Sequence, residues 1–375
     1  MASNSDNPVL VHLFMRGGMD SISALVPAGD PNYRTARPTS SIPEDKLIQI
    51  DQTFGFHPAM AGLAELYSAG ELAIVHGLAN PSEVRSHFDA QDDVDRGWPG
   101  NTSELTGWMA RTANAMTPRE IPAFAIGKMM PRSLWGLPSA VAVPSLFGFR
   151  IRDLSQQNSP LAAAFSTMYT LDEPDVAAAQ GQRTLALLQR FGTINGSADT
   201  PERYGGSDIG HDLWQVAQLL NSDLDVGLVA VDHNGWDLHA QMGFWNEGRM
   251  QTQINHLSTA LTAFWADIEA KRDSVVVVCE SEFGRRIVEN NSQGTDHGDA
   301  SVGLILGTSV NGGRSFGQWP GLDLDPTAGI ARTTDFRSVL SSALVNHLGL
   351  GSAIETILPE FSQSEDPVAQ LFATA

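Results

Sequence analysis

Carboxylates and imidazoles gather in five short segments of this chain of 375 residues. The segments are Arg16–Ser21, Arg85–Asp89, Asp232–His239, Glu280–Arg286 and Gly294–Gly298. Together they supply the mixture of Asp or Glu oxygens and His nitrogens that divalent cations bind in proteins. If the fold brings the segments together, they predict a metal site.

Each segment alone also has a purely structural interpretation. A single Asp or His at the end of a strand is usually a helix cap or a turn residue, because Asp and Asn favour turns. The pair Asp237 and His239 is weak evidence by itself, since such a spacing often occurs by chance. Three of the five segments, however, directly follow predicted strands, and this shared position favours a joint metal site.

Short apolar runs that alternate with helical patterns predict the framework for these segments. Strands are expected at Val9–Met15, Leu72–His76, Gly227–Val231, Ser274–Cys279 and Gly303–Leu306, and helices at Pro58–Gly70, Leu185–Arg190, Asp212–Leu220, Arg249–Lys271 and Asp335–Leu348. Such alternation is typical of a layered α/β fold with a mainly parallel sheet, and the Val-rich run before Cys279 indicates a sheet covered on both faces. Open sheets of this kind bind ligands beyond the carboxyl ends of their strands. We expect a single domain over residues 1–375, with residues 195–210, rich in Gly, Ser, Asp and Pro, as a candidate mobile loop.

The composition excludes several classes of partner and site. Asp and Glu number 43 against 23 Lys and Arg, which gives a formal net charge of −20. Nucleic acid and anionic lipid are therefore not expected as partners, because such a surface repels phosphate groups. The apolar runs are strand-sized and far short of the roughly 20 residues that span a bilayer, so we expect a soluble protein. The single cysteine, Cys279, excludes an internal disulfide and a Cys-rich metal site, and its Val-rich surroundings predict a buried thiol.

Several motifs are missing from the sequence, and their absence narrows the chemistry. There is no Walker-type phosphate loop, no G-x-G-x-x-G after the first strand and no H-E-x-x-H helix. A G-x-S-x-G pattern occurs at 313–317, but no apolar run directly precedes it, as a strand-to-helix elbow requires. Nucleotide-cofactor chemistry and the usual α/β serine-hydrolase chemistry are therefore disfavoured.

Seven ordered blocks carry a resemblance to a known family. They lie at 13–20, 56–59, 86–91, 235–239, 281–285, 294–298 and 333–337. Over about residues 9–350 the chain resembles the uncharacterised bacterial proteins grouped as domain-of-unknown-function family 1501, within the alkaline phosphatase and sulfatase-like superfamily. The resemblance implies an alkaline phosphatase-like layered α/β/α sandwich. Members of the family are commonly exported by the twin-arginine route, so we expect a periplasmic protein whose signal segment is absent from this chain, with a cytoplasmic protein as the alternative.

The resemblance also implies a set of site residues. The implied metal ligands are Asp20, Asp237, His239, Glu282 and His297. The pair formed by Asp237 and His239 has a shorter spacing than in the superfamily, so Asp232 or His233 could take one of these places. We expect Zn²⁺, as one or two ions, with Mn²⁺ or Ca²⁺ as alternatives.

The implied catalytic residues are Ser86, His87 and Arg285. Ser86 matches the nucleophile position, although His87 beside it is not part of the superfamily pattern. Arg285, or alternatively Arg16, would hold an anionic substrate through paired N–H groups; a salt bridge to an acidic residue is an equal alternative for Arg285. Phe283 stands where the superfamily has His, so a second metal site would be weakened, rebuilt by His87, or empty.

These observations lead to one functional hypothesis and two alternatives. We expect a metal-dependent hydrolase or transferase that acts on a phosphate or sulfate ester of a small molecule or glycan, with a Ser or a metal-bound water as nucleophile. A formylglycine sulfatase is disfavoured because no Cys-x-Pro-x-Arg or Ser-x-Pro-x-Arg segment is present. The alternatives are a non-catalytic ligand- or partner-binding protein with a degenerate metal site, and another metal reaction on an uncharged substrate. The sequence does not define the oligomeric state.

Overall fold

A nine-stranded sheet forms the centre of the computed structural model, which describes residues 7–148, 159–169, 176–194, 196–362 and 367–373. The strand order is β11-β5-β10-β9-β1-β8-β6-β7, and β12 pairs with β5. The strands are β1 (Val9–Met15), β5 (Leu72–Ala79), β6 (Ile121–Ile126), β7 (Val141–Val143), β8 (Val226–His233), β9 (Val275–Glu280), β10 (Ser301–Leu306), β11 (Ser315–Phe316) and β12 (Thr334–Asp335). A second sheet of three short strands joins β2 (Leu25–Val26), β4 (Gly55–Phe56) and β3 (Ile48–Gln49).

Strand β1 shows why the sheet is buried on both faces. Its residues Val9, Val11 and Leu13 join one core cluster, and the intervening Leu10 and Phe14 join another. Successive side chains of a strand point to opposite faces, so a continuous apolar run must be covered on both. The strand pairs in parallel with β8 on one side and with β9 on the other. The expected layered α/β/α fold with a mainly parallel sheet is confirmed.

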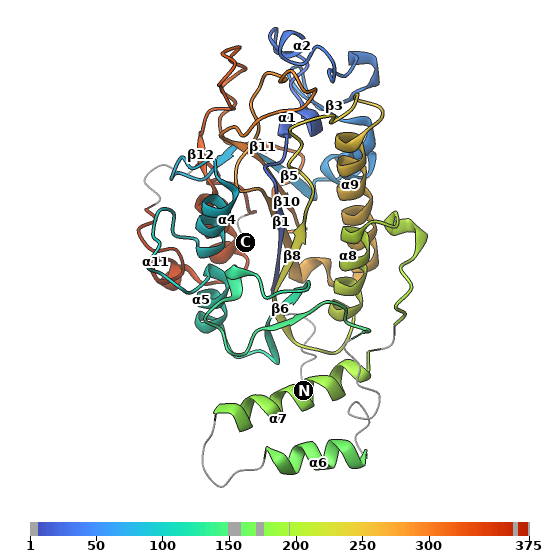
Figure 1. Cartoon of the computed structure of the whole chain (residues 1–375), viewed down its shortest axis with the longest axis vertical. Helices are drawn as coiled ribbons and strands as arrows, with labels where there is room; N and C mark the ends of the chain where they lie inside the picture. The colour runs from blue at the N-terminus through green and yellow to red at the C-terminus, as the bar shows by residue number, and fades with distance from the viewer. Residues whose placement is uncertain (1–6, 149–158, 170–175, 195, 363–366, 374–375) are drawn as a thin grey trace.

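Helices cover the two faces of the sheet (Figure 1). One face packs against α3 (Ala61–Ser68), α8 (Asp208–Leu220) and α9 (Arg249–Asp267), and the other against α4 (His87–Arg96), α5 (Trp108–Ala115), α10 (Phe336–Asn346) and α11 (Ile354–Ile357). The pair α6 (Pro160–Met168) and α7 (Val176–Gly192) projects from one end of the molecule around a small apolar cluster of its own. Short helices occur at α1 (Ser21–Ala24) and α2 (Tyr33–Ala36).

The structure differs from the expectations at a few elements. Strands β6 and β7 were not expected, and β10 runs antiparallel to both β5 and β9. The long helix α9 ends at Asp267, and a 3-10 helix over Glu269–Ser274 follows it. Of the expected loop over residues 195–210, residue 195 lies outside the described residues, and the remainder contains a 3-10 helix (Glu202–Tyr204) and the start of α8.

The structure bears on two expectations drawn from the composition, the buried thiol and the absence of a membrane-spanning segment. Cys279 is a buried free thiol in β9, as expected, and burial raises its pKa. Within the part of the chain that the structure describes, no helix combines the length and the apolar character needed to cross a membrane.

Candidate metal centre

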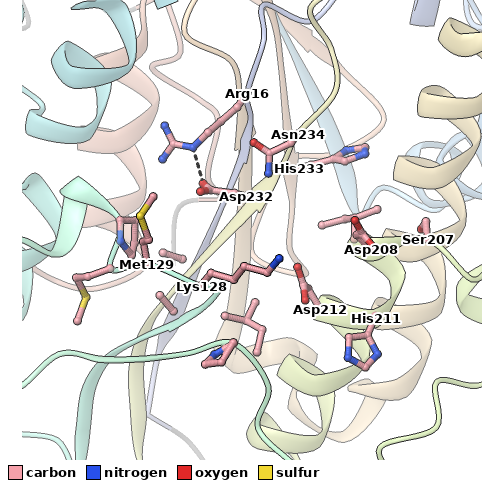
Figure 2. A pocket seen from close by; sticks show the side chains of 18 of the residues that line it. Arg16, Lys128, Met129, Ser207, Asp208, His211, Asp212, Asp232, His233 and Asn234 are labelled. Atoms are coloured by element: carbon pink, nitrogen blue, oxygen red, sulfur yellow. Dashed lines mark ion pairs between the residues drawn. The ribbon is translucent and has the colours of Figure 1, made fainter. Parts of the chain in front are cut away.

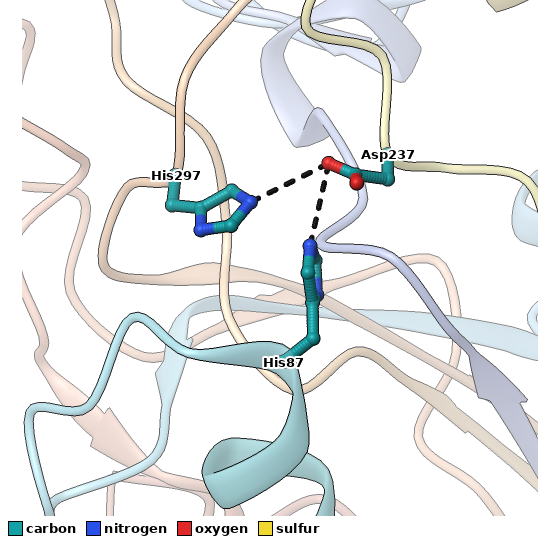
Figure 3. Close-up of side chains that lie close together, drawn as sticks. All are labelled: His87, Asp237 and His297. Carbon is teal, nitrogen blue, oxygen red and sulfur yellow. Dashed lines mark ion pairs between the residues drawn. The ribbon is translucent and has the colours of Figure 1, made fainter.

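Three imidazoles converge on one carboxylate oxygen at the carboxyl ends of the central strands. The oxygen is Oδ1 of Asp237, in the loop after β8, and it lies 3.3 Å from Nε2 of His87 at the start of α4. It also lies 3.0 Å from Nε2 of His239 and 3.4 Å from Nε2 of His297. Figure 3 shows His87 and His297 both pointing at the Asp237 carboxylate. The ligand atoms of His87, Asp237 and His297 all lie within 4.8 Å of one another, close enough to hold one metal ion.

Each imidazole in this cluster is oriented by a second contact through its other nitrogen. The contacts of Nδ1 are those of His87 with Glu282 Oε1 at 2.7 Å, His239 with Asp296 Oδ1 at 3.1 Å and His297 with the carbonyl oxygen of Arg85 at 2.7 Å. Oxygens of this kind accept hydrogen bonds, so Nδ1 carries the proton and the lone pair of each neutral ring lies on Nε2. Metal-binding histidines in proteins are oriented by this kind of contact.

The lone pairs on the Nε2 atoms face neither a hydrogen-bond donor nor a cation in the cluster. The Nε2 atoms of His239 and His297 lie only 2.9 Å apart, and Nε2 of His87 is buried without a hydrogen-bond partner. Two lone pairs that face each other at such a distance repel, unless a proton or a cation lies between them. Three imidazole nitrogens and one carboxylate oxygen form a ligand set that suits a divalent transition metal, so the residues present fit a metal ion.

Electrostatics places most of the cluster in the protonation state that ligates a metal. Burial raises the pKa of Asp237, but the hydrogen bond and charge of Arg285, with those of the nearby imidazoles, outweigh burial and lower it to about 2. Burial lowers the pKa of His297, and the charges of His87, Arg285 and His239 lower it further. Burial also opposes a charge on His87, but the hydrogen bond and charge of Glu282 outweigh it and raise the pKa of His87. A metal ion would therefore compete with a proton chiefly at His87.

Arg285 holds together the loops that carry the cluster. Its buried guanidinium donates to the carbonyl oxygens of Gly17, of Gly18 at 2.7 Å and of Thr295 at 3.0 Å, and to Oδ1 of Asp237 at 2.5 Å. These hydrogen bonds engage the whole guanidinium of Arg285 with other protein groups. The structure therefore shows Arg285 in a salt bridge with Asp237, which was the alternative to binding an anionic substrate.

Gly17 is required for the close approach of two of these loops. Its φ is +117°, and a Cβ there would lie 2.6 Å from the backbone nitrogen of Asp237. A residue with a side chain at this position would therefore be strained and would also displace Asp237.

Glu282 supports the cluster from behind. It is completely buried and accepts hydrogen bonds from Nδ1 of His87, Nε2 of Gln91 and the backbone N–H of Gly17. Burial raises the pKa of Glu282, but these hydrogen bonds outweigh burial and keep it below the usual value. The structure therefore places Glu282 as the acceptor that orients His87, in place of the expected direct ligand. Gln91 lies one helical turn after His87 on α4, and this spacing is the sequence signal that could have identified it.

The structure does not bring Asp20 into the cluster. Both carboxylate oxygens of Asp20 are bound by the buried guanidinium of Arg37, at 2.8 Å to Oδ1 and 2.5 Å to Oδ2, and Oδ2 also accepts from Ser23. A carboxylate engaged in this way is unavailable to a metal ion. No spacing in the sequence indicates Arg37 as its partner.

The remaining expected residues lie around the cluster. Ser86 occupies the N-cap position of α4 beside His87, but its side chain makes no capping hydrogen bond. Arg16 forms ion pairs with Asp95 and Asp232, so neither Arg16 nor Asp232 reaches the cluster. The ring of Phe283, buried, lies 4.8 Å from that of His87 and 4.9 Å from that of His297 between centroids. Phe283 therefore packs a hydrocarbon wall against the imidazoles.

Comparison with known proteins gives a family match over part of the chain. The model of the family described as "Protein of unknown function (DUF1501)" matches residues 216–347. No curated protein matches the chain. This match confirms the resemblance inferred from the sequence over the region that carries Asp237, His239, Glu282 and His297.

Solved structures similar to the chain are distant from it. The C-terminal periplasmic domain of EcEptC from Escherichia coli, in complex with Zn, is 9% identical with a TM-score of 0.39, over 80% of this chain and 73% of that one. The PsFucS1 sulfatase from Pseudoalteromonas sp. is 10% identical with a TM-score of 0.35, over 93% and 68%. The phosphonate monoester hydrolase SpPMH from Silicibacter pomeroyi is 10% identical with a TM-score of 0.36, over 96% and 78%. The family match is a likeness to the family of unknown function DUF1501 over residues 216–347, about a third of the chain.

Proposed function

We propose that this protein is a metal-dependent hydrolase or transferase that acts on a phosphate or sulfate ester at a one-metal centre. The observation that carries the proposal is the convergence of three oriented Nε2 atoms on Oδ1 of Asp237. The ligands would be His87, Asp237, His239 and His297. Such an ion supplies Lewis acidity toward an ester oxygen and acidifies water.

The ligand set also bears on which metal is bound. Zn²⁺ is commonly held by imidazole nitrogens with carboxylate oxygens, and Mn²⁺ is a weaker competitor for the same ligands. Ca²⁺ takes six to eight oxygen ligands, so a centre with three nitrogens disfavours it. The packing of Phe283 against His87 and His297 supports a single ion, because a phenyl ring offers no ligand where a second imidazole would be needed.

The chain's own residues have distinct parts in this proposal. Glu282 and Asp296 hold the protons of Nδ1 of His87 and His239, so that the opposite nitrogens stay free to ligate. Ser86 remains the proposed covalent nucleophile because it lies next to His87 at the start of α4. The alternative nucleophile is water.

Two arginines, Arg85 and Arg332, lie in a network of charges beside the centre. The carbonyl of Arg85 holds His297, while its side chain and that of Arg332 share the carboxylate of Asp299. Arg332 also pairs with Glu83 at 3.2 Å, so the two guanidiniums are balanced by two carboxylates, of which that of Glu83 is largely exposed to solvent. We propose that Arg85, which lies beside His297 and is partly exposed, takes the anion-attracting part expected of Arg285, with a small-molecule or glycan ester as substrate and the periplasm as the compartment.

The proposal is tested by metal analysis together with a substrate screen. Purified protein is expected to hold about one equivalent of Zn²⁺ or Mn²⁺ and to hydrolyse at least one of a panel of aryl phosphates, phosphodiesters, phosphonates and aryl sulfates. Asp237→Asn should lose both properties, whereas the exposed control Asp323→Asn should keep both. Turnover that survives in Ser86→Ala identifies water as the nucleophile, and a phosphoserine or sulfoserine trapped at Ser86 identifies a covalent route. Turnover that is unchanged in Asp237→Asn contradicts the proposal.

A second candidate is a non-catalytic binding protein of the same fold. Its support is the salt bridge of 2.5 Å between Arg285 and Asp237, because a guanidinium already neutralises the carboxylate at the centre of the cluster. Folded protein that takes up no divalent ion, as wild type or as Arg285→Met, would favour this candidate.

A further inference from the structure

A large cavity lies beside the metal centre and includes none of its four ligands. It has a volume of about 1040 Å³ and lies at the carboxyl ends of β6 and β8, between α4 and the start of α8. Figure 2 shows Arg16 and Asp232 on one side, and Asp208, His211 and Asp212 from α8 on the other. Gln91 lines the cavity and also donates to Glu282 behind the metal centre. The cavity and the centre are thus neighbours with separate walls.

Carboxylates outnumber cations on the wall of this cavity. A single guanidinium, that of Arg16, is shared between Asp95 at 3.1 Å and Asp232 at 2.8 Å. Asp208 and Asp212 also line the cavity, and among the described residues neither has an ion-pair partner.

Two further cations line the same wall. The side chain of Arg132 contacts Asp92, which does not line the cavity, at 3.3 Å. Lys128 is therefore the cation left to offset Asp208 and Asp212, and the wall keeps an excess of negative charge.

Two residues that line the cavity each hold a buried acceptor without a partner. Oδ1 of Asp95 and Nδ1 of His233 are buried and make no hydrogen bond, and the two residues are only 3% and 4% exposed. Nε2 of His233 lies 3.0 Å from Oε1 of Gln253, whose NH2 group donates to the backbone carbonyl of Gly235. The amide oxygen therefore faces His233, so Nε2 carries the proton and Nδ1 is a bare acceptor.

We propose that this cavity binds a cationic amine. A buried acceptor without a donor costs free energy, and the unmet demand of Asp95 and His233 is for N–H or O–H donors. The unpaired carboxylates of Asp208 and Asp212 add a demand for positive charge. An ammonium group in the cavity meets the demand for positive charge with its full charge, and its three N–H donors would reach Asp95 and His233 once those side chains turn to expose Oδ1 and Nδ1. The inference concerns a site apart from the metal centre and stands whether or not that centre is catalytic.

The charge state of Asp212 agrees with this inference. Burial, together with the charges of Asp208 and Asp232, raises the pKa of Asp212 to about 7. Asp208 lies one helical turn before Asp212 on α8, and Asp232 lies near the end of β8, so the three charges repel one another and an ammonium group among them would relieve that repulsion.

The test compares two ligands of the same length. Putrescine carries two ammonium groups, and 1,4-butanediol carries hydroxyl groups in their place. Binding is measured by calorimetry at low salt, on protein treated with a chelator and on protein loaded with Zn²⁺. Putrescine is expected to bind at least tenfold more tightly than 1,4-butanediol in both preparations. Equal affinities, or no binding of putrescine, would overturn the proposal.

Variants locate the site. Asp208→Asn/Asp212→Asn should weaken putrescine binding at least tenfold, whereas Lys128→Gln should leave it equal or tighter because a competing cation is removed. Asp45→Asn/Asp223→Asn removes the same charge from exposed positions elsewhere and should leave the affinity within about twofold. An affinity that survives in Asp208→Asn/Asp212→Asn, or falls equally in the control, would refute the cavity as the site. A failure here leaves the metal-uptake test untouched, because the two use different ligands and different variants.

Discussion

Replacing Glu282 by Gln removes one charge while keeping the shape of the side chain that orients His87. Oε1 of Glu282 accepts from Nδ1 of His87 at 2.7 Å and from Gln91 at 2.8 Å, and the side chain is completely buried. A Gln that keeps its oxygen at the Oε1 position still accepts both bonds. Its NH2 group then lies at the Oε2 position, 3.1 Å from Oγ of Ser281, which can accept. The variant should fold, with a neutral acceptor behind His87.

The expected loss can be worked out from these contacts. A hydrogen bond to a charged group contributes about 1.5–3 kcal/mol and one between neutral groups about half of that, so the bond to His87 weakens by about 0.8–1.5 kcal/mol. A difference of about 1.4 kcal/mol is a factor of ten in affinity. The negative charge also favours the metal-bound imidazole, and loss of such an acceptor typically costs 10–100-fold in metal affinity. We expect Glu282→Gln to weaken Zn²⁺ binding about 10- to 100-fold.

A second buried Glu–His pair supplies the matched control. Glu280 is also completely buried and lies 2.8 Å from Nε2 of His12, on the neighbouring strand β1. Neither residue faces the metal centre. Glu280→Gln makes the same chemical change two residues earlier, in the last residue of β9, so it should lower the free energy of unfolding without changing Zn²⁺ affinity. Competition with a chromogenic chelator measures the affinity, and urea denaturation measures the stability.

The two variants together can refute the reasoning. Unchanged affinity in Glu282→Gln would mean that His87 is not a ligand, or that its orientation does not depend on Glu282. An equal loss of affinity in both variants would mean that the effect arises from general destabilisation of the sheet.

Three further outcomes follow from the structure. Wild-type protein should gain about 2.7 kcal/mol in the free energy of unfolding at free Zn²⁺ 100 times the Kd, and Asp237→Asn should lose this gain in thermal unfolding measured with and without the ion. Gly17→Ala should lower the free energy of unfolding by about 1–3 kcal/mol in urea denaturation, because φ is +117°. The variant should also weaken Zn²⁺ binding, because the new Cβ displaces Asp237. A loss of stability with unaltered Zn²⁺ affinity would contradict this effect on binding. Burial lowers the pKa of His76 from 6.5 to about 4. Between these two pH values the unfolded chain therefore binds a proton at His76 that the folded chain does not. The free energy of unfolding should fall as the pH falls through this range, by at most about 1.4 kcal/mol per pH unit from this residue. Urea denaturation at pH 7, 6, 5 and 4.5 should show that the free energy of unfolding falls less steeply for His76→Gln than for wild type. Equal slopes in the two proteins would disprove the contribution of His76.

The central strands could be predicted from the sequence because their apolar runs have no other explanation. Strand β1 has the expected bounds, and β8, β9 and β10 differ from expectation by no more than two residues at either end. Strand β6 was missed because Pro122 interrupts it, and proline is rare inside strands. The antiparallel direction of β10 was also missed, since an apolar run is the same in either direction.

The candidate site was predictable only in part. The position of polar residues after strands pointed to Asp237, His239 and His297, which the structure brings together. The pairing of Asp20 with Arg37 depends on a contact across the fold that local spacing does not encode. The sequence could not predict that Glu282 orients His87 either. A carboxylate that follows a strand can bind the metal ion directly, or it can accept a hydrogen bond from a residue that binds the ion.

The insertion of β1 between β8 and β9 has a consequence for how the protein is made. During synthesis β1 leaves the ribosome early, but both of its parallel neighbours lie after residue 225. The first proposed ligand, His87, must wait for His297, some 210 residues later. At about 5–20 residues per second this wait is on the order of ten seconds or more, during which the apolar strand β1 has no partner in the sheet. The ion would be loaded after most of the chain has been translated, and the nascent N-terminal part is where a chaperone would be needed.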